Sequence, residues 1–518
     1  MDTIKNNLPA SDGIKIYGFG VVAKGFYDYL QKSNEAERLQ IVIIKDASKK
    51  RAVINAIIET TNENTIRDKD VDVIVELISS SEEAYGIVAE NLEIGKKVIS
   101  ANKKLIAENL QDLISKEKEN NGTFLYEGAV CGSIPIIRIL NDFYSTESIQ
   151  SVKGIFNGSS NYILSQLFNK EVTYGEALKQ AQDLGFAEAD PTSDVGGFDA
   201  LYKLVILATH SFGKIIHPNE ILNFGIENIS KSDIELAKKL NLKIKLIAKA
   251  ELKSGKLSLS VLPTLVDSSS GLYQVENEYN AVEISSENVG VQFYKGKGAG
   301  GLPTGSVVYS DLKAIDNNYN YSYGKLNQSN IILDNFSQVD VLIKIPNKDD
   351  VDTLPFNVSY LTKVDGEENY FYAKTTLNEI QVNKKYIEQY GISLLFIDNE
   401  EIKIQLLSSD EAEVKTINVA ELRNWIIKDD DFQLIDVRES SEYEFTNING
   451  ELIPLGEIES NLSKIQKDRK VVFQCRSGKR SADAIKLLQK KYGFDNLYNL
   501  EGGILAWADE IDSSIKKY

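Results

Sequence analysis

A glycine-rich turn near the start of the chain limits the fold more than any other feature of the sequence. Residues 18–25 read GFGVVAKG and follow a short apolar run, IKIY. They have the G-x-G-x-x-A form of a dinucleotide-binding turn between a strand and a helix. Gly18 permits the tight turn, Gly20 lets the main chain approach a pyrophosphate, and Ala23 keeps the helix close to the sheet. The turn predicts a strand and a helix whose N-terminus binds an anion.

The surrounding sequence extends this unit to a parallel sheet. From Ile14 to about Ala107, β-branched runs alternate with stretches of helical periodicity, which is typical of a doubly wound α/β domain. At the start of the first helix, the free N–H groups of Val21 and Val22 are expected to bind the cofactor. The alternative is a glycine turn with a purely structural role.

Charged residues after the second predicted strand bear on the choice of cofactor. Residues 45–51 read KDASKKR. Asp46 would hydrogen-bond the ribose 2′-hydroxyl of NAD, whereas Lys45 and the cations after it would neutralise the 2′-phosphate of NADP. Four cations around one acid favour NADP over NAD. The alternative is a solvated loop with no role in binding.

Two further candidates follow another predicted strand at the same edge of the sheet. The segment SANK places Ser100 and Lys103 where a strand ends and a helix begins. Doubly wound sheets bind their ligands at this edge, so Ser100 is expected at the cofactor and Lys103 at the cofactor and substrate. The alternative for Lys103 is an ordinary surface charge.

The densest acidic stretch combines a predicted loop, residues 188–198, with a helix predicted over residues 199–212. Asp199 and Lys203 lie four apart on this helix, so their side chains share a face and can share a proton. The alternative is a structural ion pair. The acidic loop, which contains Glu188 and Asp194, suits a substrate ammonium group.

Composition excludes several other classes of protein. The chain has 58 basic and 76 acidic residues, a net charge of −18 and a pI near 4.9, which argues against nucleic-acid binding. Its two cysteines, Cys131 and Cys475, cannot form a disulfide framework and fit a reducing cytoplasm. Cys131 has no nearby His or Arg and is interpreted as a buried small hydrophobe. No segment reaches the roughly 18 apolar residues of a membrane span, and a soluble, cytoplasmic protein is predicted.

Six blocks make the region from about 14 to 312 resemble homoserine dehydrogenase. In order they are GFGVVAKG, VISANKKLIA, YEGAVCGSIPII, GIFNGSSNYIL, GFAEADPTSDVGGFDALYKLVILA and GKGAGGLPTGSVVYSDL. The resemblance implies an oxidoreductase that interconverts L-homoserine and L-aspartate 4-semialdehyde with NADP or NAD, in threonine and methionine biosynthesis. It also implies a homodimer or a higher homo-oligomer.

The resemblance also implies roles for single residues. Lys203 and Lys103 resemble the catalytic lysines, Asp199 their partner, and Glu188 the substrate-binding carboxylate. Gly300, in the last block, joins the residues expected at the cofactor. A monovalent-cation site, for Na+ or K+, is implied at Glu127 with the main chain of Val130, Gly132 and Ile134. The departures are Ala23 for the third glycine, Lys45 where arginine is common, and Cys131 where glycine is usual.

The C-terminal region, from about 415 to 518, resembles a single-domain rhodanese. Its loop CRSGKRS runs from Cys475 to Ser481 between a predicted strand and helix. The N–H groups of the turn and the cations Arg476, Lys479 and Arg480 are expected to lower the pKa of Cys475 and to hold a persulfide or thiosulfate. Cys475 is thus predicted to be catalytic, with Arg476 and Arg480 binding the substrate. The sulfur donor would be thiosulfate or a persulfide carrier. The alternative is a non-catalytic sulfur-sensing or docking module.

The predicted fold is α/β with four regions. These are an NAD(P)-binding Rossmann domain (1–128, completed by about 300–316), an α+β catalytic and dimerisation domain (129–312), a small α+β module (331–412) and an α/β rhodanese-like domain (415–518). The stretch 317–330, NNYNYSYGKLNQSN, has the composition of a linker. The module after it carries no chemical motif and is interpreted as a separate unit, either a divergent ACT-like regulatory module or a spacer.

Overall fold

The protein forms two compact units in a computed structural model. One unit runs to Ile402, apart from residues 364–368, and the other contains those residues and the chain from Lys403 onward. The residues described are 13–45, 56–60, 71–170, 172–327, 330–345, 357–358, 360–364, 369–407 and 414–517. Within them, no helix has both the length and the apolar character needed to cross a bilayer.

The first part of the larger unit is a parallel sheet of six strands in the order β3-β2-β1-β4-β5-β6. The strands are β1 (Ile14–Tyr17), β2 (Leu39–Ile44), β3 (Ile57–Thr60), β4 (Val73–Glu76), β5 (Lys97–Ser100) and β6 (Thr123–Leu125). Every residue of β1 and β4 is buried, as expected for β-branched strands covered on both faces. The direction of winding reverses beside β1, and doubly wound sheets bind ligands at the carboxyl edge of that point. The predicted Rossmann fold is confirmed.

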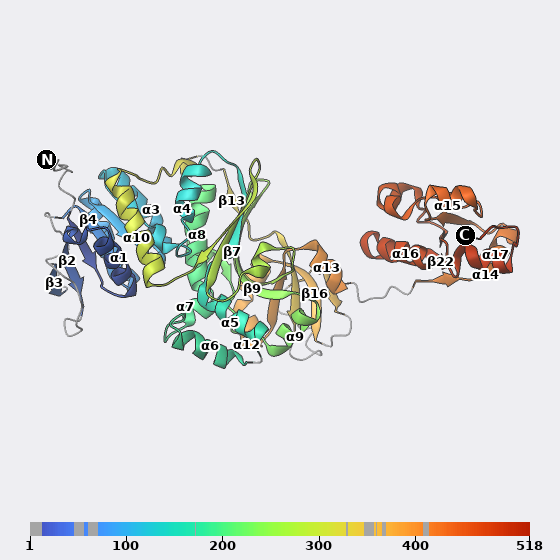
Figure 1. Cartoon of the computed structure of the whole chain (residues 1–518), viewed down its shortest axis with the longest axis horizontal. Helices are drawn as coiled ribbons and strands as arrows, with labels where there is room; N and C mark the ends of the chain where they lie inside the picture. The colour runs from blue at the N-terminus through green and yellow to red at the C-terminus, as the bar shows by residue number, and fades with distance from the viewer. Residues whose placement is uncertain are drawn as a thin grey trace, which may run out of the picture. The chain divides into compact units, whose positions relative to one another are not determined.

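Four helices pack on this sheet: α1 (Val21–Lys32), α2 (Ser81–Glu93), α3 (Lys103–Glu119) and, from much later in the sequence, α10 (Gly301–Asp316). Helix α10, yellow in Figure 1, lies beside α1. A Cβ atom on Gly25 would lie only 2.0 Å from the carbonyl oxygen of Gly301, so the two main chains nearly touch. Gly25 therefore permits a close contact between α1 and α10, which the sequence analysis did not predict.

The second part of the larger unit is built on an 11-stranded sheet. Its main path begins β12-β11-β7-β9-β10, with β8 paired to β10. These strands are β7 (Ile149–Ile155), β8 (Leu222–Asn223), β9 (Lys243–Lys253), β10 (Lys256–Val266), β11 (Tyr279–Ser286) and β12 (Gly290–Lys297). The helices are α4 (Ile136–Arg138), α5 (Gly158–Asn169), α6 (Tyr174–Asp183), α7 (Thr192–Val195), α8 (Phe198–Phe212) and α9 (Lys231–Lys239). Helix α8 matches the helix predicted over 199–212. The predicted loop 188–198 contains the short helix α7, so that part of the prediction was wrong.

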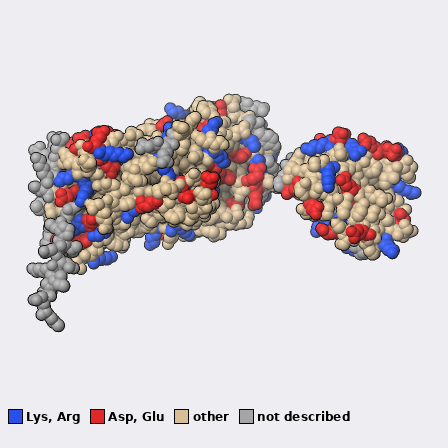
Figure 2. Space-filling view, turned by 90° about the horizontal axis from the view of Figure 1, so that it is seen from above, with Lys and Arg blue, Asp and Glu red and all other residues tan. Residues whose placement is uncertain are grey.

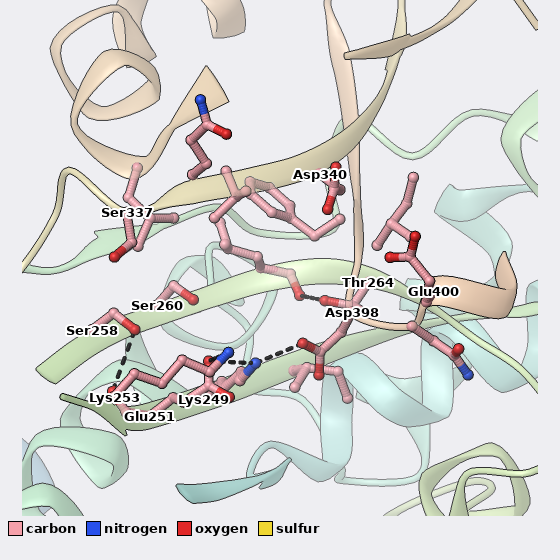
Figure 3. Close-up of a pocket in the computed structure, with 18 of the residues that line it drawn as sticks. Lys249, Glu251, Lys253, Ser258, Ser260, Thr264, Ser337, Asp340, Asp398 and Glu400 are labelled. Carbon is pink, nitrogen blue, oxygen red and sulfur yellow. Dashed lines mark hydrogen bonds and ion pairs between the residues drawn. The ribbon is translucent and has the colours of Figure 1, made fainter. Parts of the chain in front are cut away.

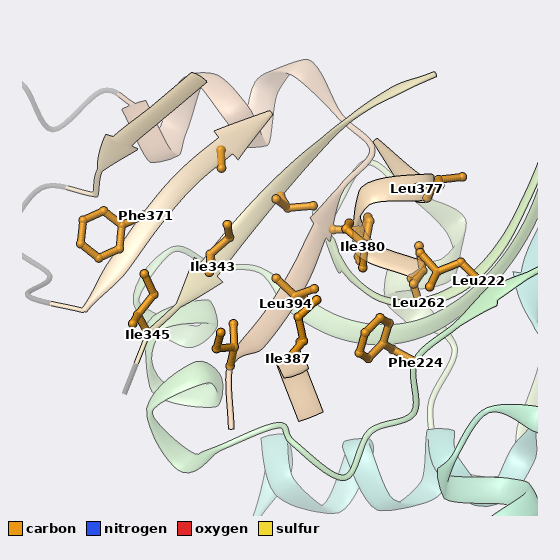
Figure 4. Close-up of a cluster of buried hydrophobic side chains, with 14 residues drawn as sticks. Leu222, Phe224, Leu262, Ile343, Ile345, Phe371, Leu377, Ile380, Ile387 and Leu394 are labelled. Atoms are coloured by element: carbon orange, nitrogen blue, oxygen red, sulfur yellow. The ribbon is translucent and has the colours of Figure 1, made fainter. Parts of the chain in front are cut away.

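Residues 331–402 do not form a separate unit, which corrects the sequence prediction. Strand β17 (Ser393–Ile397) pairs with β10, and the sheet continues through β14 (Gln338–Lys344), β16 (Tyr370–Thr376) and β15 (Tyr360–Lys363). Strand β13 (Ile332–Leu333) also pairs with β10, and the helices are α11 (Leu377–Val382), α12 (Lys384–Gln389) and α13 (Glu400–Leu407). The shared apolar cluster explains the continuity: Leu222, Phe224 and Leu262 pack with module residues such as Ile343 and Leu394 (Figure 4). Burying this surface stabilises both parts together.

The stretch predicted as a linker is in fact anchored to the catalytic core. Tyr321 and Tyr323 are 4% and 5% exposed, and the Tyr323 hydroxyl lies 3.0 Å from that of Tyr126. The Tyr126 hydroxyl also lies 2.9 Å from Nε2 of His210, a buried residue of α8. The composition was misleading because these tyrosines alternate with Asn and Ser, while their rings form a buried aromatic cluster.

The smaller unit contains a parallel five-stranded sheet in the order β18-β22-β21-β19-β20. Its strands are β18 (Thr416–Ile417), β19 (Phe432–Asp436), β20 (Glu451–Leu452), β21 (Lys470–Gln474) and β22 (Leu497–Leu500). Its helices are α14 (Val419–Lys428), α15 (Ser440–Phe445), α16 (Lys479–Tyr492) and α17 (Gly503–Glu510). Two apolar clusters lie wholly within residues 414–515, so this region has its own core.

Candidate active site

The central feature of the larger unit is a carboxylate held between two lysines. On α8, Asp199 Oδ2 lies 2.6 Å from Nζ of Lys203, and Asp199 Oδ1 lies 2.8 Å from Nζ of Lys103 at the start of α3. Lys203 also donates to the carbonyl oxygen of Phe156, at 2.7 Å. The side chains of Asp199 and Lys203 are 4% and 9% exposed, whereas that of Lys103 is 41% exposed. Lys103 is therefore the member of this triad that a ligand can reach directly.

The electrostatics of the triad favour its charged form. Burial acts to raise the pKa of Asp199, but Lys103 and Lys203 outweigh burial and hold that pKa below its ordinary value. The charge of Asp199 in turn raises the pKa of Lys103, and Asp194 and Glu188 add to this effect. Two cations around one carboxylate leave a net positive charge, which suits a substrate oxygen that becomes negative.

Asn157, which the sequence reasoning missed, joins this triad to the acidic loop. Its amide nitrogen donates to Asp194 Oδ1 at 2.7 Å and to Asp199 Oδ2 at 2.9 Å. Its oxygen accepts from the N–H of Ser160 at 2.7 Å and so caps helix α5. Burial raises the pKa of Asp194, and the charge of Asp199 raises it further. A buried amide beside two carboxylates thus lowers the cost of placing them together. The motif GIFNGSSN contains this residue, but spacing alone gave it no role.

The acidic loop lies near the triad, and the nucleotide-binding turn has a backbone that leaves room for a ligand. Glu188 is exposed, and it lies close enough for its charge to act on Lys103. Gly18 has φ +84°, and a Cβ there would lie 2.7 Å from the Leu77 carbonyl oxygen. A Cβ on Gly20 would meet nothing within 4 Å, which leaves the open approach that a pyrophosphate requires. Gly300, with φ +128°, precedes the first residue of α10.

The other residues of the turn divide by exposure. Val21, at 70%, is exposed, Val22 is half-buried and Ala23 is fully buried against the sheet. Ser100 is also fully buried and donates its hydroxyl to Glu76 at 2.5 Å, so only its main chain faces the edge of the sheet. Lys45 pairs with Glu83 at 2.5 Å. Asp46, Lys49, Lys50 and Arg51 lie outside the described residues.

The residues predicted at a cation site form a tight turn. The side-chain oxygens of Glu127 accept from the N–H groups of Ile137, at 2.7 Å, and Arg138, at 2.9 Å. Burial first, and then the charge of Asp311, raise the pKa of Glu127 to about 8. Each carboxyl oxygen of Glu127 therefore already accepts one hydrogen bond from the main chain. The described residues contain no cluster of three His, Cys, Asp or Glu side chains that could bind a metal.

Cys131 has an unusual backbone conformation within this turn. Its φ is +54°, a left-handed value that favours glycine, and its side chain is fully buried. Burial raises the pKa of its thiol to about 12, and Lys203, Asp199 and Asn280 also act on it. Cys131 is thus a buried, neutral thiol behind the triad, which matches its interpretation as a small hydrophobe.

Known families match both units of the chain. The family "Homoserine dehydrogenase, NAD binding domain" matches residues 18–127, and "Homoserine dehydrogenase" matches residues 135–312. The homoserine dehydrogenase of Bacillus subtilis (strain 168) is 38% identical over 315 residues, which cover 59% of this chain and 73% of that protein. The chain belongs to the homoserine dehydrogenase family. The enzyme from Helicobacter pylori is similar at 37% identity over 316 residues, 58% of this chain and 73% of that protein.

Solved structures extend the likeness beyond the matched sequence. A homoserine dehydrogenase from Thiobacillus denitrificans aligns with a TM-score of 0.64 and 25% identity, over 75% of this chain and 99% of that one. Since 75% of 518 residues is about 389, this alignment runs beyond residue 312. A hyperthermophilic archaeal homoserine dehydrogenase in complex with NADPH aligns with a TM-score of 0.51 and 25% identity, over 60% of this chain and 99% of that one.

This homoserine dehydrogenase also carries a rhodanese-like domain, whose family matches residues 418–510. Cys475, 1% exposed, accepts hydrogen bonds at its sulfur from the N–H of Gly478 at 3.1 Å and the hydroxyl of Ser481 at 3.3 Å. Arg480 makes two 2.7 Å hydrogen bonds to Glu442 of α15. The loop thus forms the donor cradle expected around a sulfur anion, with the charge of Arg480 already paired.

A separate groove of about 440 Å³ lies on the catalytic sheet, between β9 and β10 on one side and the start of β14 on the other (Figure 3). Its charged side chains mostly pair with one another: Lys249 lies 2.6 Å from Asp398 and 3.2 Å from Glu251. The triad, and not this groove, combines a buried carboxylate with an accessible cation at the carboxyl edge of the nucleotide-binding sheet. We therefore place the chemistry at the triad.

On the face shown in Figure 2, acidic and basic side chains are interspersed.

Proposed function

We propose that the enzyme interconverts L-homoserine and L-aspartate 4-semialdehyde at the triad of Lys103, Asp199 and Lys203. The observation that carries the proposal is the placement of Asp199 between both lysines, within 2.8 Å, at the carboxyl edge of a dinucleotide-binding sheet. In the reduction of L-aspartate 4-semialdehyde, the Lys203 ammonium donates a proton to the oxygen that becomes the hydroxyl while the carbon gains a hydride, and homoserine oxidation runs the same two transfers in reverse. A bound nicotinamide supplies the hydride acceptor.

The two lysines differ in their exposure and in the number of N–H groups that remain for the substrate. Lys203 has given two of its three N–H groups to Asp199 and Phe156, so one remains for the substrate oxygen. Lys103 has two left and its side chain is partly exposed, so its charge can stabilise an alkoxide on the substrate. Glu188 and Asp194 carry the negative charge that a substrate ammonium group requires.

We propose NADP as the better cofactor, on the charge of Lys45 after β2. Its ion pair with Glu83 weakens the preference, because a 2′-phosphate must compete with that carboxylate. The test is homoserine oxidation by the purified full chain with NADP or NAD, followed by the absorbance of the reduced cofactor. We expect a higher kcat/KM with NADP. Equal or higher efficiency with NAD would overturn the preference, and no turnover with either cofactor would overturn the function.

We propose that the turn from Glu127 to Ile134 binds a monovalent cation through main-chain oxygens. The support is the conformation of the turn, in which two successive residues have positive φ, Cys131 at +54° and Gly132 at +58°. Replacing K+ or Na+ by a large organic cation is expected to lower the melting temperature of the larger unit. An unchanged melting temperature and rate would contradict this site.

A second candidate function, sulfur transfer, is favoured by the two hydrogen bonds at Cys475. The Gly478 N–H and the Ser481 hydroxyl stabilise negative charge on sulfur, as a thiolate or persulfide requires. The donor would be thiosulfate or a persulfide carrier, bound with the help of Arg476 and of Arg480 once it leaves Glu442. The alternative is a sulfur-sensing or docking module. Thiosulfate-dependent sulfur transfer by the full chain separates the two.

Two further features support proposals on regulation and assembly. The order β17-β14-β16-β15, with antiparallel neighbours, is the 4-1-3-2 order of a ferredoxin-like sheet, which supports an ACT-like regulatory role for residues 331–402. Strand β12 ends its sheet and exposes Val291 and Phe293, at 64% and 40%. Such an edge supports a homodimer, which light scattering of the purified chain would test.

A further inference from the structure

A buried carboxyl group of the first sheet takes no part in the triad. Glu76 is the last residue of β4, at the carboxyl edge of the first sheet, and is 0% exposed. It accepts from the hydroxyl of Ser100, at the end of β5, at 2.5 Å and from the N–H of Ile78 at 2.7 Å. Both donors are neutral, so the charge of an ionised Glu76 is not balanced by them.

Glu76 has no cationic partner among the described residues, where no Lys, Arg or His nitrogen forms an ion pair with it. Its neighbours in the sheet are Tyr17 on β1 and Ser100 on β5. Lys103, the first residue of α3, forms its ion pair with Asp199 and not with Glu76. Burial raises the pKa of Glu76 to about 7, against smaller opposite effects of its two hydrogen bonds. The group can therefore gain or lose a proton near neutral pH.

The position of Glu76 relative to the cofactor follows from the topology. The adenosine ribose of a dinucleotide binds after β2, where Lys45 lies, and the pyrophosphate binds at the turn after β1. The nicotinamide half must then extend to the other side of β1, over β4 and β5. Lys103, which begins α3 directly after β5, brings the triad to this same side. Glu76 thus ends the strand over which the nicotinamide lies.

We propose that the ionised carboxylate of Glu76 stabilises the cationic ring of the oxidised nicotinamide cofactor, so that binding of the oxidised form releases a proton from Glu76. The reduced ring is neutral and has no such attraction to the carboxylate. Glu76 is thus a positioning and charge-balancing residue that favours the oxidised cofactor as pH rises. The inference rests on the nicotinamide-dependent reaction proposed above.

The direction of the pH effect follows from linkage. With a pKa near 7 in the free protein and a lower pKa in the complex, oxidised cofactor must displace a proton at pH 6 but not at pH 8.5. Its affinity is therefore expected to rise about tenfold over this interval, since each pH unit below the pKa changes affinity by about tenfold. The affinity for the reduced form should not show this tenfold rise. The oxidised and reduced forms carry the same phosphate groups, so the titration of these phosphates affects both affinities equally and cancels in the comparison.

The test measures dissociation constants of NADP+ and NADPH for the full chain at pH 6 and pH 8.5, with calorimetry in two buffers of different ionisation enthalpy. At pH 7 we expect release of about half a proton per NADP+ and none per NADPH. Glu76→Gln keeps the size of the side chain and should abolish the pH-dependent difference between the two cofactor forms. It should also abolish the proton release.

The chain offers a matched control in Glu117. Burial raises the pKa of this carboxyl group to about 7 as well, and it accepts from the N–H of Phe124. It lies 14 residues after Lys103 on α3, or about 21 Å away at 1.5 Å per residue. Glu117→Gln should leave the cofactor difference intact.

Three results would overturn the proposal. The first is a Glu76→Gln variant that keeps the pH-dependent difference in affinity between NADP+ and NADPH, and the second is a Glu117→Gln variant that loses this difference to the same extent as Glu76→Gln. The third is the absence of proton release when NADP+ binds to the unmodified protein. If Glu76→Gln does not fold, the proton count of the unmodified protein decides alone. If neither cofactor form binds, the nicotinamide-dependent function fails with the inference. Binding of both forms without pH linkage defeats only the inference.

Discussion

Asn157 joins the two carboxylates on which the active site depends. Its amide donates one hydrogen bond each to Asp194 and Asp199, and its oxygen caps helix α5. An aspartate at this position could still cap the helix, because its oxygen can accept from Ser160. It would remove both donated hydrogen bonds and add a third negative charge. The substitution therefore separates the role of Asn157 in the site from its role in the fold.

We predict that Asn157→Asp lowers kcat/KM for homoserine by about 100-fold, the cost of misplacing reacting groups by about 1 Å. The acid limb of the pH profile should move to higher pH, because an added carboxylate raises the pKa values of Asp194 and Asp199. Asn169→Asp, at the exposed end of the same helix, adds the same charge. It should change neither kcat/KM nor the position of the acid limb. A profile with an unmoved acid limb would limit Asn157 to a structural role.

At the scale of elements, the module after residue 331 shares its core with the catalytic domain. Ile343 of β14 is 0% exposed and belongs to a cluster that includes Leu222, Phe224 and Leu262 (Figure 4). Two parts that bury one apolar cluster are expected to unfold together. A spacer would instead unfold in a transition of its own.

We predict that Ile343→Ala destabilises the dehydrogenase unit by about 2–5 kcal/mol, the cost of a large-to-small change in a core. Urea denaturation should be followed by two probes, homoserine oxidation and secondary structure. Both should report a single transition, at a lower urea concentration than in the unmodified protein. Val382→Ala, on the 74% exposed Val382 of the same module, should change stability by less than about 0.5 kcal/mol. Loss of the module's structure while the activity transition stays in place would show that the two parts are independent.

The elements themselves were largely predictable, and the contacts between them were not. The period of apolar residues identified α8, and with it the common face of Asp199 and Lys203, because both depend on local geometry alone. The contact of Lys103 with Asp199 joins two domains, and no local pattern encodes it. The burial of Tyr321 and the pairing of β17 with β10 likewise depend on distant partners, so composition suggested a linker and a separate module.

At the scale of the whole molecule, the two candidate chemistries lie in different compact units. The dehydrogenase triad belongs to the unit that runs to Ile402, and Cys475 belongs to the unit that begins at Lys403. The rhodanese-like domain has apolar clusters of its own, within residues 414–515. Residues 415–518 alone are therefore expected to fold and to show the same thermal transition as in the full chain.

The two activities should then be separable by single substitutions. Lys203→Ala removes a buried proton carrier and should lower homoserine oxidation by at least about 100-fold, while thiosulfate-dependent sulfur transfer persists. Cys475→Ser should abolish sulfur transfer and leave homoserine oxidation unchanged, because a hydroxyl of nearly the same size keeps its hydrogen bonds but cannot form a persulfide.

The other cysteine cannot substitute, since Cys131 is fully buried and burial raises its pKa to about 12. Sulfur transfer that survives Cys475→Ser would therefore refute the role of that loop. A collapse of homoserine oxidation in the same variant, with its melting transition intact, would instead show that the two sites are coupled.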